Sequence, residues 1–245
     1  MLEGKNILIT GSSSGIGLAT ARLAKKYGAN VIVHGKEASG ELDAITQELG
    51  AEKIICDISD GDAVSREIKK LLEKKIQIHC LANVAGAIKN RGPFLETTDE
   101  DWISDYKTNV LGIVHMCQSV IPQMQSNKYG RIVNIGSVRA YPQGTLSTRT
   151  PYSASKAAVL NLTVALAKEY AKDGISINSI SPGGVNTDIA KAWDAATQKR
   201  NSDVLLCRIA EPEEIAEAIC FFLSDKASYA TGQDFVFDGG CLIGK

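Results

Sequence analysis

The segment ILITGSSSGIGLATARLA, residues 7–24, joins an apolar, strand-like run to a helix-like run through a turn with three glycines. Gly11, Gly15 and Gly17 give the turn the spacing G-x-x-x-G-x-G instead of the commoner G-x-G-x-x-G. Glycine lets backbone N–H groups approach a pyrophosphate, and the N-terminus of a helix attracts its negative charge. The hydroxyls of residues 12–14 would add donors. Such a turn alone is weak evidence, but its position at the start of a βαβ series predicts dinucleotide binding.

Short apolar runs alternate with longer amphipathic segments along the whole chain, which is typical of βαβ units on a parallel sheet. The expected strands are NILIT, NVIVHG, EKIICD, IQIHCLANVAG, GRIVNIG, ISINSISPGG and DFVFDGG. The expected helices lie near 15–27, 38–49, 61–74, 99–125, 152–172, 188–203 and 212–223, several of them ended by glycine (Gly28, Gly50, Gly174). We therefore expect one α/β domain over residues 1–245, in three layers, with a doubly wound, seven-stranded parallel sheet that binds ligands at the carboxyl ends of its strands.

Composition excludes several other classes of protein. The 245 residues carry a formal net charge of -1 with no basic run, which argues against binding to nucleic acid. No apolar stretch is long enough for a membrane span and no signal peptide is recognisable, so we expect a soluble cytoplasmic protein. The six cysteines and three histidines lack metal-ligand spacing, so we expect reduced, mostly buried thiols and no metal.

The end of the second expected strand bears on the choice of cofactor. An acidic residue there would bind the ribose 2′-OH of NAD, but VIVHGKE has Gly35 followed by Lys36. A cation at this position favours the 2′-phosphate of NADP(H). Two alternatives stay open: Glu37 turns back toward the ribose, or Lys36 is only a solvated lysine.

A second chemical signal is the run PYSASK, residues 151–156. Tyr152 and Lys156 are four residues apart, so they share a helix face if a helix begins near Pro151 with Thr150 as its N-cap. A phenol titrates near about 10, and a nearby ammonium would lower its pKa toward the range of acid–base catalysis. The alternative is a solvated helix face, which would be the better interpretation if the pair stood alone. Ser137, at the end of the expected strand GRIVNIG, would reach a substrate oxygen from the other side.

Taken together, these motifs resemble the short-chain dehydrogenase/reductase family of single-domain Rossmann-fold enzymes, and the resemblance covers nearly the whole chain. TGSSSGIG (10–17) matches the family's glycine turn, NVAG (83–86) its N-N-A-G motif, SPGGVNT (181–187) its nicotinamide segment, and ASYATGQDFVFDGG (227–240) its C-terminal part. Two departures stand out: Val84 replaces an asparagine, and the spacer 139–150 is longer than usual.

The resemblance implies hydride transfer between a nicotinamide and a carbonyl or alcohol carbon. It implies that Tyr152 exchanges the proton, Ser137 holds the substrate oxygen and Lys156 tunes the phenol and binds the nicotinamide ribose. Asn109 in KTNVLG would hold a water through its backbone carbonyl; the alternative is a merely local hydrogen bond. The implied cofactor-binding residues are Gly11, Ser13, Ser14, Gly15, Ile16, Gly17, Lys36, Asp57, Ile58, Asn83, Ala85, Gly86, Tyr152, Lys156, Pro182, Gly183, Val185 and Thr187.

The substrate is less well defined by the sequence. We expect residues 186–207 to form a mobile lid, with Trp193 against an apolar pocket or, alternatively, in the core or an oligomer contact. Arg139 either recognises a carboxylate or phosphate on the substrate or is a surface residue. The overall pattern most resembles 3-oxoacyl-[acyl-carrier-protein] reductases, which share their motifs with sugar, steroid and secondary-metabolite enzymes. Lys128 and Lys172 would contribute to a basic rim for the acidic carrier protein, although Asp173 weakens it.

Two further hypotheses concern function and assembly. A protein that binds the dinucleotide without catalysis, as a redox sensor or scaffold, is the alternative to an enzyme; the presence of both Tyr152 and Lys156 argues against it. The expected helices 99–125 and 152–172 carry apolar residues around much of their circumference, which predicts a homotetramer with approximate D₂ symmetry. These residues are Val110, Leu111, Ile113, Val114, Met116, Val159, Leu160, Leu162, Val164 and Leu166.

Overall fold

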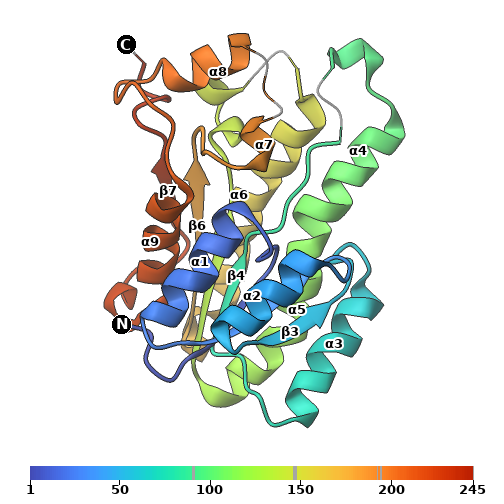
Figure 1. Cartoon of the computed structure of the whole chain (residues 1–245), viewed down its shortest axis with the longest axis vertical. Helices are drawn as coiled ribbons and strands as arrows, with labels where there is room; N and C mark the ends of the chain where they lie inside the picture. Colours follow the sequence, from blue (N-terminus) through green and yellow to red (C-terminus); the bar gives the residue numbers. More distant parts are fainter. Residues whose placement is uncertain (90–91, 146–147, 192, 194, 245) are drawn as a thin grey trace.

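A computed structural model describes residues 1–89, 92–145, 148–191, 193 and 195–244 of the chain (Figure 1). Seven parallel strands form one sheet in the order β3-β2-β1-β4-β5-β6-β7. Their bounds are β1 Asn6–Ile9, β2 Asn30–Gly35, β3 Glu52–Ile55, β4 Cys80–Asn83, β5 Gly130–Ile135, β6 Ile175–Pro182 and β7 Asp234–Phe237. The predicted doubly wound sheet is confirmed. The chain reverses its direction of winding between β1 and β4, and ligands of such sheets bind beside that reversal.

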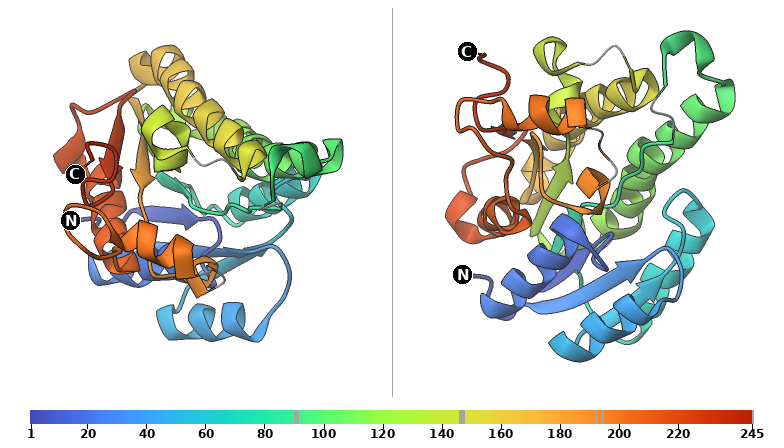
Figure 2. Two further views of the ribbon diagram at one scale, coloured as in Figure 1. Left: turned by 90° about the horizontal axis from the view of Figure 1, so that it is seen from above. Right: turned by 45° about the horizontal axis from the view of Figure 1, so that its top comes forward.

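Helices cover both faces of the sheet and make three layers (Figure 2). One face packs against α1 Gly15–Lys26, α2 Gly40–Leu49 and α9 Pro212–Leu223, and the other against α3 Gly61–Glu73, α5 Gly112–Asn127 and α6 Thr150–Tyr170. Alternate residues of β1 serve the two cores: Ile7 and Ile9 face the first, and Leu8 faces the second. Strands buried on both faces need such unbroken apolar runs, which is why the sequence pattern located them.

Two expected helices are interrupted, and one begins earlier than expected. The segment 99–125 forms α4 Asp99–Tyr106, a π-helical turn η2 Lys107–Leu111 and then α5. The segment 188–203 forms α7 Asp188–Lys191 and α8 Ala195–Ser202. The N-cap of α6 is Arg149, with φ 67°, so Thr150 is its first residue and not its cap. Short 3₁₀ turns are η1 Phe94–Glu96, η3 Val138–Ala140, η4 Pro142–Gly144, η5 Ala171–Asp173 and η6 Asp225–Ala227.

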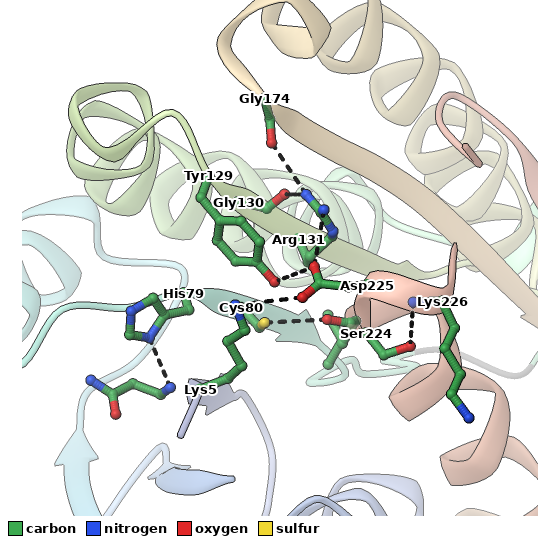
Figure 3. A network of polar contacts seen from close by, with 12 residues as sticks. Lys5, His79, Cys80, Tyr129, Gly130, Arg131, Gly174, Ser224, Asp225 and Lys226 are labelled. Carbon is green, nitrogen blue, oxygen red and sulfur yellow. Dashed lines mark hydrogen bonds and ion pairs between the residues drawn. The ribbon is translucent and has the colours of Figure 1, made fainter. Parts of the chain in front are cut away.

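The amino ends of the central strands are tied together by a polar network (Figure 3). Asp225 of η6 accepts hydrogen bonds from the Tyr129 hydroxyl at 3.0 Å and from Arg131 at 3.2 Å, and its other oxygen lies 3.7 Å from the Lys5 ammonium. The cations of Lys5 and Arg131 lie 3.9 and 4.5 Å from the centre of the Tyr129 ring. Strands β1, β5 and the segment after α9 are thereby joined at the end of the sheet opposite to the expected site.

Four cysteines are buried as expected: Cys56, Cys80, Cys117 and Cys220. Cys207 is exposed and Cys241 half-buried, and all six are free thiols. Within the described residues, no helix is both long and apolar enough to cross a membrane.

The apolar residues that suggested an oligomer are mostly covered within the chain. Val110, Ile113, Met116 and Val159 are buried in the second core, and Val164 is the one of the ten that is exposed. Helix α4 packs on α6, and the π-helical turn η2 contacts α4, α5 and α6, so these elements cover part of one another's apolar surface. Larger exposed apolar side chains lie instead just before and on α4: Phe94, Leu95, Ile103 and Tyr106.

Candidate active site

The glycine turn after β1 leaves the N-terminus of α1 open to an anion. Gly11 has φ 66°, and a Cβ on Gly17 would lie 2.1 Å from the Gly11 carbonyl oxygen, so both positions require glycine. The first turn of α1 holds no acidic residue, and the N-cap Ser14 makes no side-chain capping bond. The backbone N–H groups of this turn are therefore suited to a phosphate. Ser12 does not share this role, since its buried hydroxyl accepts from the His34 N–H at 2.7 Å.

His34 holds the turn in place, a role that the sequence analysis missed. Its Nδ1 accepts from the Gly11 N–H at 3.0 Å, and its Nε2 lies 3.0 Å from the Cys56 carbonyl oxygen. Because Nδ1 is an acceptor, the ring must be neutral, with its proton on Nε2. Burial lowers the pKa of His34, in agreement with a neutral ring. A histidine at the end of β2 gives no such signal in the sequence, because its partners come from β1 and from beyond β3.

A pocket beside the turn is lined by most of the expected adenosine and pyrophosphate contacts. Lys36 lies 3.0 Å from Asp57, and its side chain is 67% exposed. Burial works to raise the pKa of Asp57, but the bonds from Ser59 and Lys36 outweigh it and hold that pKa below its usual range. The expected residues in this pocket are Gly11, Ser13, Ser14, Gly15, Ile16, Gly17, Lys36, Asp57, Ile58, Ala85 and Gly86.

A second pocket lies over the carboxyl ends of β5 and β6 and contains Ser137, Tyr152 and Lys156. Pro182, Gly183, Val185 and Thr187 line it as well. Both pockets share walls, so they form one crevice from the glycine turn to Tyr152; the shared residues are Ile16, Val84, Gly86, Ala87 and Thr187. Val84, the departure from the family motif, is thus part of the crevice wall.

Tyr152 is in the first turn of α6 and lines the second pocket. Burial raises the pKa of Tyr152, while the Ser137 hydroxyl and the positive charges of Arg139 and Arg149 oppose that rise. The negative charge of Asp105 acts with burial. The net pKa is above that of a free tyrosine, so the phenol keeps its proton at neutral pH. The expectation of a pKa lowered by Lys156 is therefore not met in this structure, because desolvation of the phenol dominates.

Lys156 lies one turn further along α6 and is 3% exposed. Its Nζ donates to the Ile135 carbonyl oxygen at 2.7 Å and lies 5.8 Å from the centre of the Tyr152 ring. Burial lowers the pKa of Lys156 to about 8, and Asp105 opposes this shift. The two side chains do share a helix face toward the crevice, as the spacing predicted.

Asn109 lies in the π-helical turn η2 and is fully buried. Its side chain accepts from the Ala87 N–H at 2.9 Å and donates to the Ala87 carbonyl at 2.9 Å and to Ser155 at 3.0 Å. The Ser155 hydroxyl in turn donates to the Tyr152 carbonyl at 2.7 Å. Asn109 therefore fixes the wall of the crevice to the helix that carries Tyr152. A π-helical turn inside a longer helix often marks a functional site.

Asn83 is not part of the crevice wall. It is buried beneath it and donates to Asn134 at 2.8 Å, which in turn donates to Thr163 at 2.9 Å. This buried chain of amides ties β4 and β5 to α6. The Thr10 hydroxyl adds a similar tie, because it accepts from the backbone N–H groups of Val84 and Ala85 at 2.9 and 3.0 Å.

The outer part of the second pocket carries the residues expected to contact substrate. Arg139 and Trp193 both line it, together with Arg149 and Asn201, which the sequence analysis did not single out. Arg139 donates to the carbonyl of Gly144 and, at 3.0 Å, to the side-chain oxygen of Asn201. Asn201 belongs to α8, so Arg139 connects the long spacer 139–150 to the expected lid. Residues 192 and 194 of that lid lie outside the described residues.

The shape and chemistry of the crevice fit a nicotinamide dinucleotide. Glycines form a close-approach cradle at one end, a helix N-terminus faces it, and a hydroxyl, a phenol and an ammonium lie at the other end. The residues that would hold the dinucleotide are those of the shared crevice wall, with Lys36 and Asp57 at one end and Lys156 at the other.

Comparison with known proteins agrees with this geometry. A family model described as enoyl-(acyl carrier protein) reductase matches residues 11–241. The 3-oxoacyl-[acyl-carrier-protein] reductase FabG of Thermotoga maritima is 35% identical over 248 residues, which is 99% of each chain. Oxidoreductase UcpA of Escherichia coli strain K12 is 34% identical over 256 residues, covering 99% of this chain and 96% of that protein.

A solved structure extends the likeness to three dimensions. A short-chain type dehydrogenase/reductase from Mycobacterium ulcerans superposes with a TM-score of 0.92 at 27% identity, covering 100% of this chain and 92% of that one. The resemblance inferred from the motifs is thereby confirmed. The chain belongs to the short-chain dehydrogenase/reductase family of NAD(P)-dependent oxidoreductases.

Proposed function

We propose that this enzyme reduces the carbonyl group of a small molecule to a secondary alcohol with NADPH, through Ser137, Tyr152, Lys156 and Asn109. The observation that supports this most strongly is the single crevice that joins the glycine turn to these side chains. Ser137 and Tyr152 reach it from two different elements, the end of β5 and the start of α6. A solvated Tyr–Lys face, the alternative for the pair, would not place Lys156 in a buried position.

The proposed roles follow from the state of each side chain. A bound nicotinamide supplies the hydride. Tyr152 keeps its proton at neutral pH, because burial raises its pKa, and it donates that proton to the oxygen of the new alcohol. The Ser137 hydroxyl holds the same oxygen, and the cations Arg139 and Arg149 favour the phenolate that remains. Lys156 would bind the nicotinamide ribose and supply a positive charge there, and Asn109 holds the crevice wall at Ala87.

The preference for NADP(H) over NAD(H) rests on the tip of β2. No carboxylate occupies that tip, and Lys36 extends from it into the first pocket. The 2′-phosphate would compete with Asp57 for the ammonium of Lys36, so we expect a modest preference. Glu37, the residue that would favour NAD(H), lies outside the lining of this pocket.

For the substrate, a 3-oxoacyl thioester is the first class to test, since the matching family model and the Thermotoga maritima relative are both named for reductases of the acyl-carrier-protein type. A carboxylate or phosphate on the substrate is a second proposal. Arg139 and Arg149 both line the outer pocket, although Arg139 also organises the loop through Gly144 and Asn201. Trp193 would contact the apolar part of either substrate.

We also propose that residues 1–245 act as one domain and assemble as a homotetramer. The apolar patch of Phe94, Leu95, Ile103 and Tyr106, together with Val164, supports an interface that includes α4 and α6. The number of subunits stays a prediction.

The test compares wild-type enzyme with Tyr152→Phe on a panel of 3-oxoacyl thioesters and of ketones with and without a carboxylate, using NADPH and NADH. We expect wild-type turnover that is faster with NADPH, and a loss of about 10²–10⁴-fold in Tyr152→Phe. NADPH fluorescence should show binding to both proteins. Tyr229→Phe, at an exposed position, is the matched control and should behave as wild type. Binding of NADPH with no turnover of any substrate would contradict the proposal and favour a dinucleotide sensor.

A further inference from the structure

Asp105 is a buried carboxylate in the last turn of α4, four residues before Asn109 of the adjoining turn η2. Its Oδ1 accepts from the Lys89 N–H at 2.8 Å, while Asn109, four residues later, binds both backbone groups of Ala87. Asp105 and Asn109 thus hold the segment 87–89 by its two end residues. Ala87 and Ile88 of this segment line the pocket that contains Tyr152.

The hydrogen bond to Lys89 does not by itself require a charge at residue 105. A neutral amide oxygen would accept from the same N–H equally well. The second carboxylate oxygen of Asp105, Oδ2, is buried and accepts no hydrogen bond from the described residues. Keeping a carboxylate in such a place is unfavourable unless a nearby positive charge compensates for it.

The cation of the active site that interacts electrostatically with Asp105 is the ammonium of Lys156. Helix α4 packs on α6. Gly86 lies between the turn η2 and α6: a Cβ built there would be 3.2 Å from Asn109 Oδ1 and 3.6 Å from Lys156 Nζ. Electrostatic coupling between Asp105 and Lys156 acts on both groups: it raises the pKa of Lys156 against the lowering effect of burial, and it opposes the burial that raises the pKa of Asp105. Asp105 also raises the pKa of Tyr152.

We propose that Asp105 is a positioning residue for the reaction: its buried carboxylate holds the 87–89 segment, and its charge acts across the contact between α4 and α6 on the ammonium of Lys156. This inference rests on the proposed roles of Tyr152 and Lys156. It assigns a separate electrostatic function to a residue outside the crevice lining.

The charged groups around Asp105, Lys156 and Tyr152 determine in which direction the pH profile should move when the charge of Asp105 is removed. Asp101 on α4 acts on Asp105, Arg139 from η3 and Arg149 at the start of α6 act on Tyr152, and Lys156 faces Asp105. Removing the charge of Asp105 lowers the pKa of Lys156 and also that of Tyr152. The first proton lost from Lys156 and Tyr152 is therefore lost at lower pH in the variant, whichever of these two groups loses it.

The decisive experiment measures kcat/KM against pH for wild type and Asp105→Asn, with NADPH and acetoacetyl-coenzyme A as the probe substrate. Asparagine keeps the acceptor for Lys89 and removes the charge. We expect the alkaline decline of kcat/KM to move to lower pH by about 0.5–1 unit. Asp99→Asn, an exposed charge removal on the same helix, should leave the profile where it is. Superimposable profiles for wild type and Asp105→Asn would overturn the proposal.

Two more variants separate the charge from the hydrogen bond. Asp105→Ala removes both, so it should show the same shift as Asp105→Asn together with weaker NADPH binding. Asp105→Glu keeps the charge, so its decline should stay close to that of wild type even if its activity falls; a shift as large as that of Asp105→Asn would contradict the electrostatic role. Glutamate also serves if the asparagine variant does not fold.

Failure of this inference is distinguishable from failure of the proposed function. If Tyr152→Phe is inactive and Asp105→Asn has the profile of wild type, only the role of Asp105 is wrong. If wild type turns over no substrate, NADPH binding against pH supplies the readout, because the anionic cofactor should bind more weakly once Lys156 loses its proton. The midpoint of that loss should then be lower in Asp105→Asn, and an unchanged midpoint would overturn the proposal.

Discussion

At the amino ends of the strands Arg131 donates to three acceptors, whereas at the carboxyl ends Lys156 donates to one. The acceptors of Arg131 are the carbonyls of Gly130 and Gly174, at 2.9 and 3.2 Å, and the carboxylate of Asp225 at 3.2 Å (Figure 3). Lys156 is bound by the carbonyl of Ile135 and is more deeply buried, at 3% exposure against 9% for Arg131. Both side chains are cations at opposite ends of the same sheet, but among the described residues only Arg131 has a partner of opposite charge in direct contact.

The difference separates a network that stabilises the fold from one that serves chemistry. Around Arg131, the carboxylate of Asp225 and the aromatic ring of Tyr129 both compensate the positive charge. Around Lys156, burial without a contacting counter-ion moves the pKa into the range where enzymes work. Removing a side chain should therefore reduce stability in the Arg131 network and reduce activity around Lys156.

The largest expected effect comes from Lys156→Met, which keeps the length of the side chain and removes the ammonium. We expect turnover to fall by about 10²–10⁴-fold, since the phenolate left on Tyr152 loses a positive charge that lies 5.8 Å from the centre of its ring. We expect the free energy of unfolding at neutral pH to be unchanged or higher, because a buried cation with one acceptor is unfavourable. Steady-state kinetics and denaturant titration measure the two. A clearly less stable variant would contradict the comparison.

Repeating the denaturant titrations at alkaline pH serves as an internal check on Lys156→Met. A lysine with pKa about 8 in the folded protein and about 10.5 in the unfolded chain binds fewer protons when folded between those values. The stability of the wild type should therefore rise relative to that of the variant as pH increases through that window. The advantage of the variant over the wild type should be greatest below the window, where Lys156 is protonated in both states. A constant difference would mean that burial does not shift the pKa of Lys156.

At the opposite end, Asp225→Ala should reduce stability and leave catalysis alone. The variant loses the acceptor of Tyr129 and Arg131 and the ion pair with Lys5, and it leaves the mostly buried guanidinium without its counter-ion. Because the Asp225 side chain itself is 61% exposed, we expect a loss of about 1–2 kcal/mol in the free energy of unfolding. Asp62→Ala on the exposed face of α3 is the control. A fall in kcat/KM beyond a factor of about two would show that the two ends are coupled.

Much of this architecture was predictable because it depends on local patterns. The seven apolar runs specify the strands, and the glycine turn specifies what can approach the start of α1. The Tyr152–Lys156 spacing predicts a shared face for the same reason, since it needs only the geometry of one helix. Each of these features depends only on residues that are close together in the sequence.

The features that sequence reasoning missed depend on residues far apart in the chain. The side chain of Asn83 is buried and donates to the amide of Asn134, 51 positions later, a contact that the motif did not indicate. His34 and Asp105 find their partners on other elements, and no local pattern indicates them. The interruption at residues 107–111 puts Asn109 under Ala87, which the apolar period of the helix does not reveal. The pKa of Tyr152 depends on desolvation, which is a property of the whole crevice.

The smallest expected effect lies at the adenosine end of the crevice, where pairing resembles that of the Arg131 network. Lys36 is already bound to Asp57 and is largely exposed, so a 2′-phosphate would replace one anionic partner by another in water. We expect Lys36→Gln to weaken NADPH binding by about 3- to 10-fold and to leave NADH binding unchanged. Fluorescence titrations at two salt concentrations measure this, with Lys25→Gln near the far end of α1 as the control. Equal weakening of both cofactors would mean that Lys36 supports the pocket without recognising the phosphate. A much larger selective loss would mean that the phosphate displaces Asp57 from Lys36 and gains a less screened contact, so that this paired site behaves like the unpaired one around Lys156.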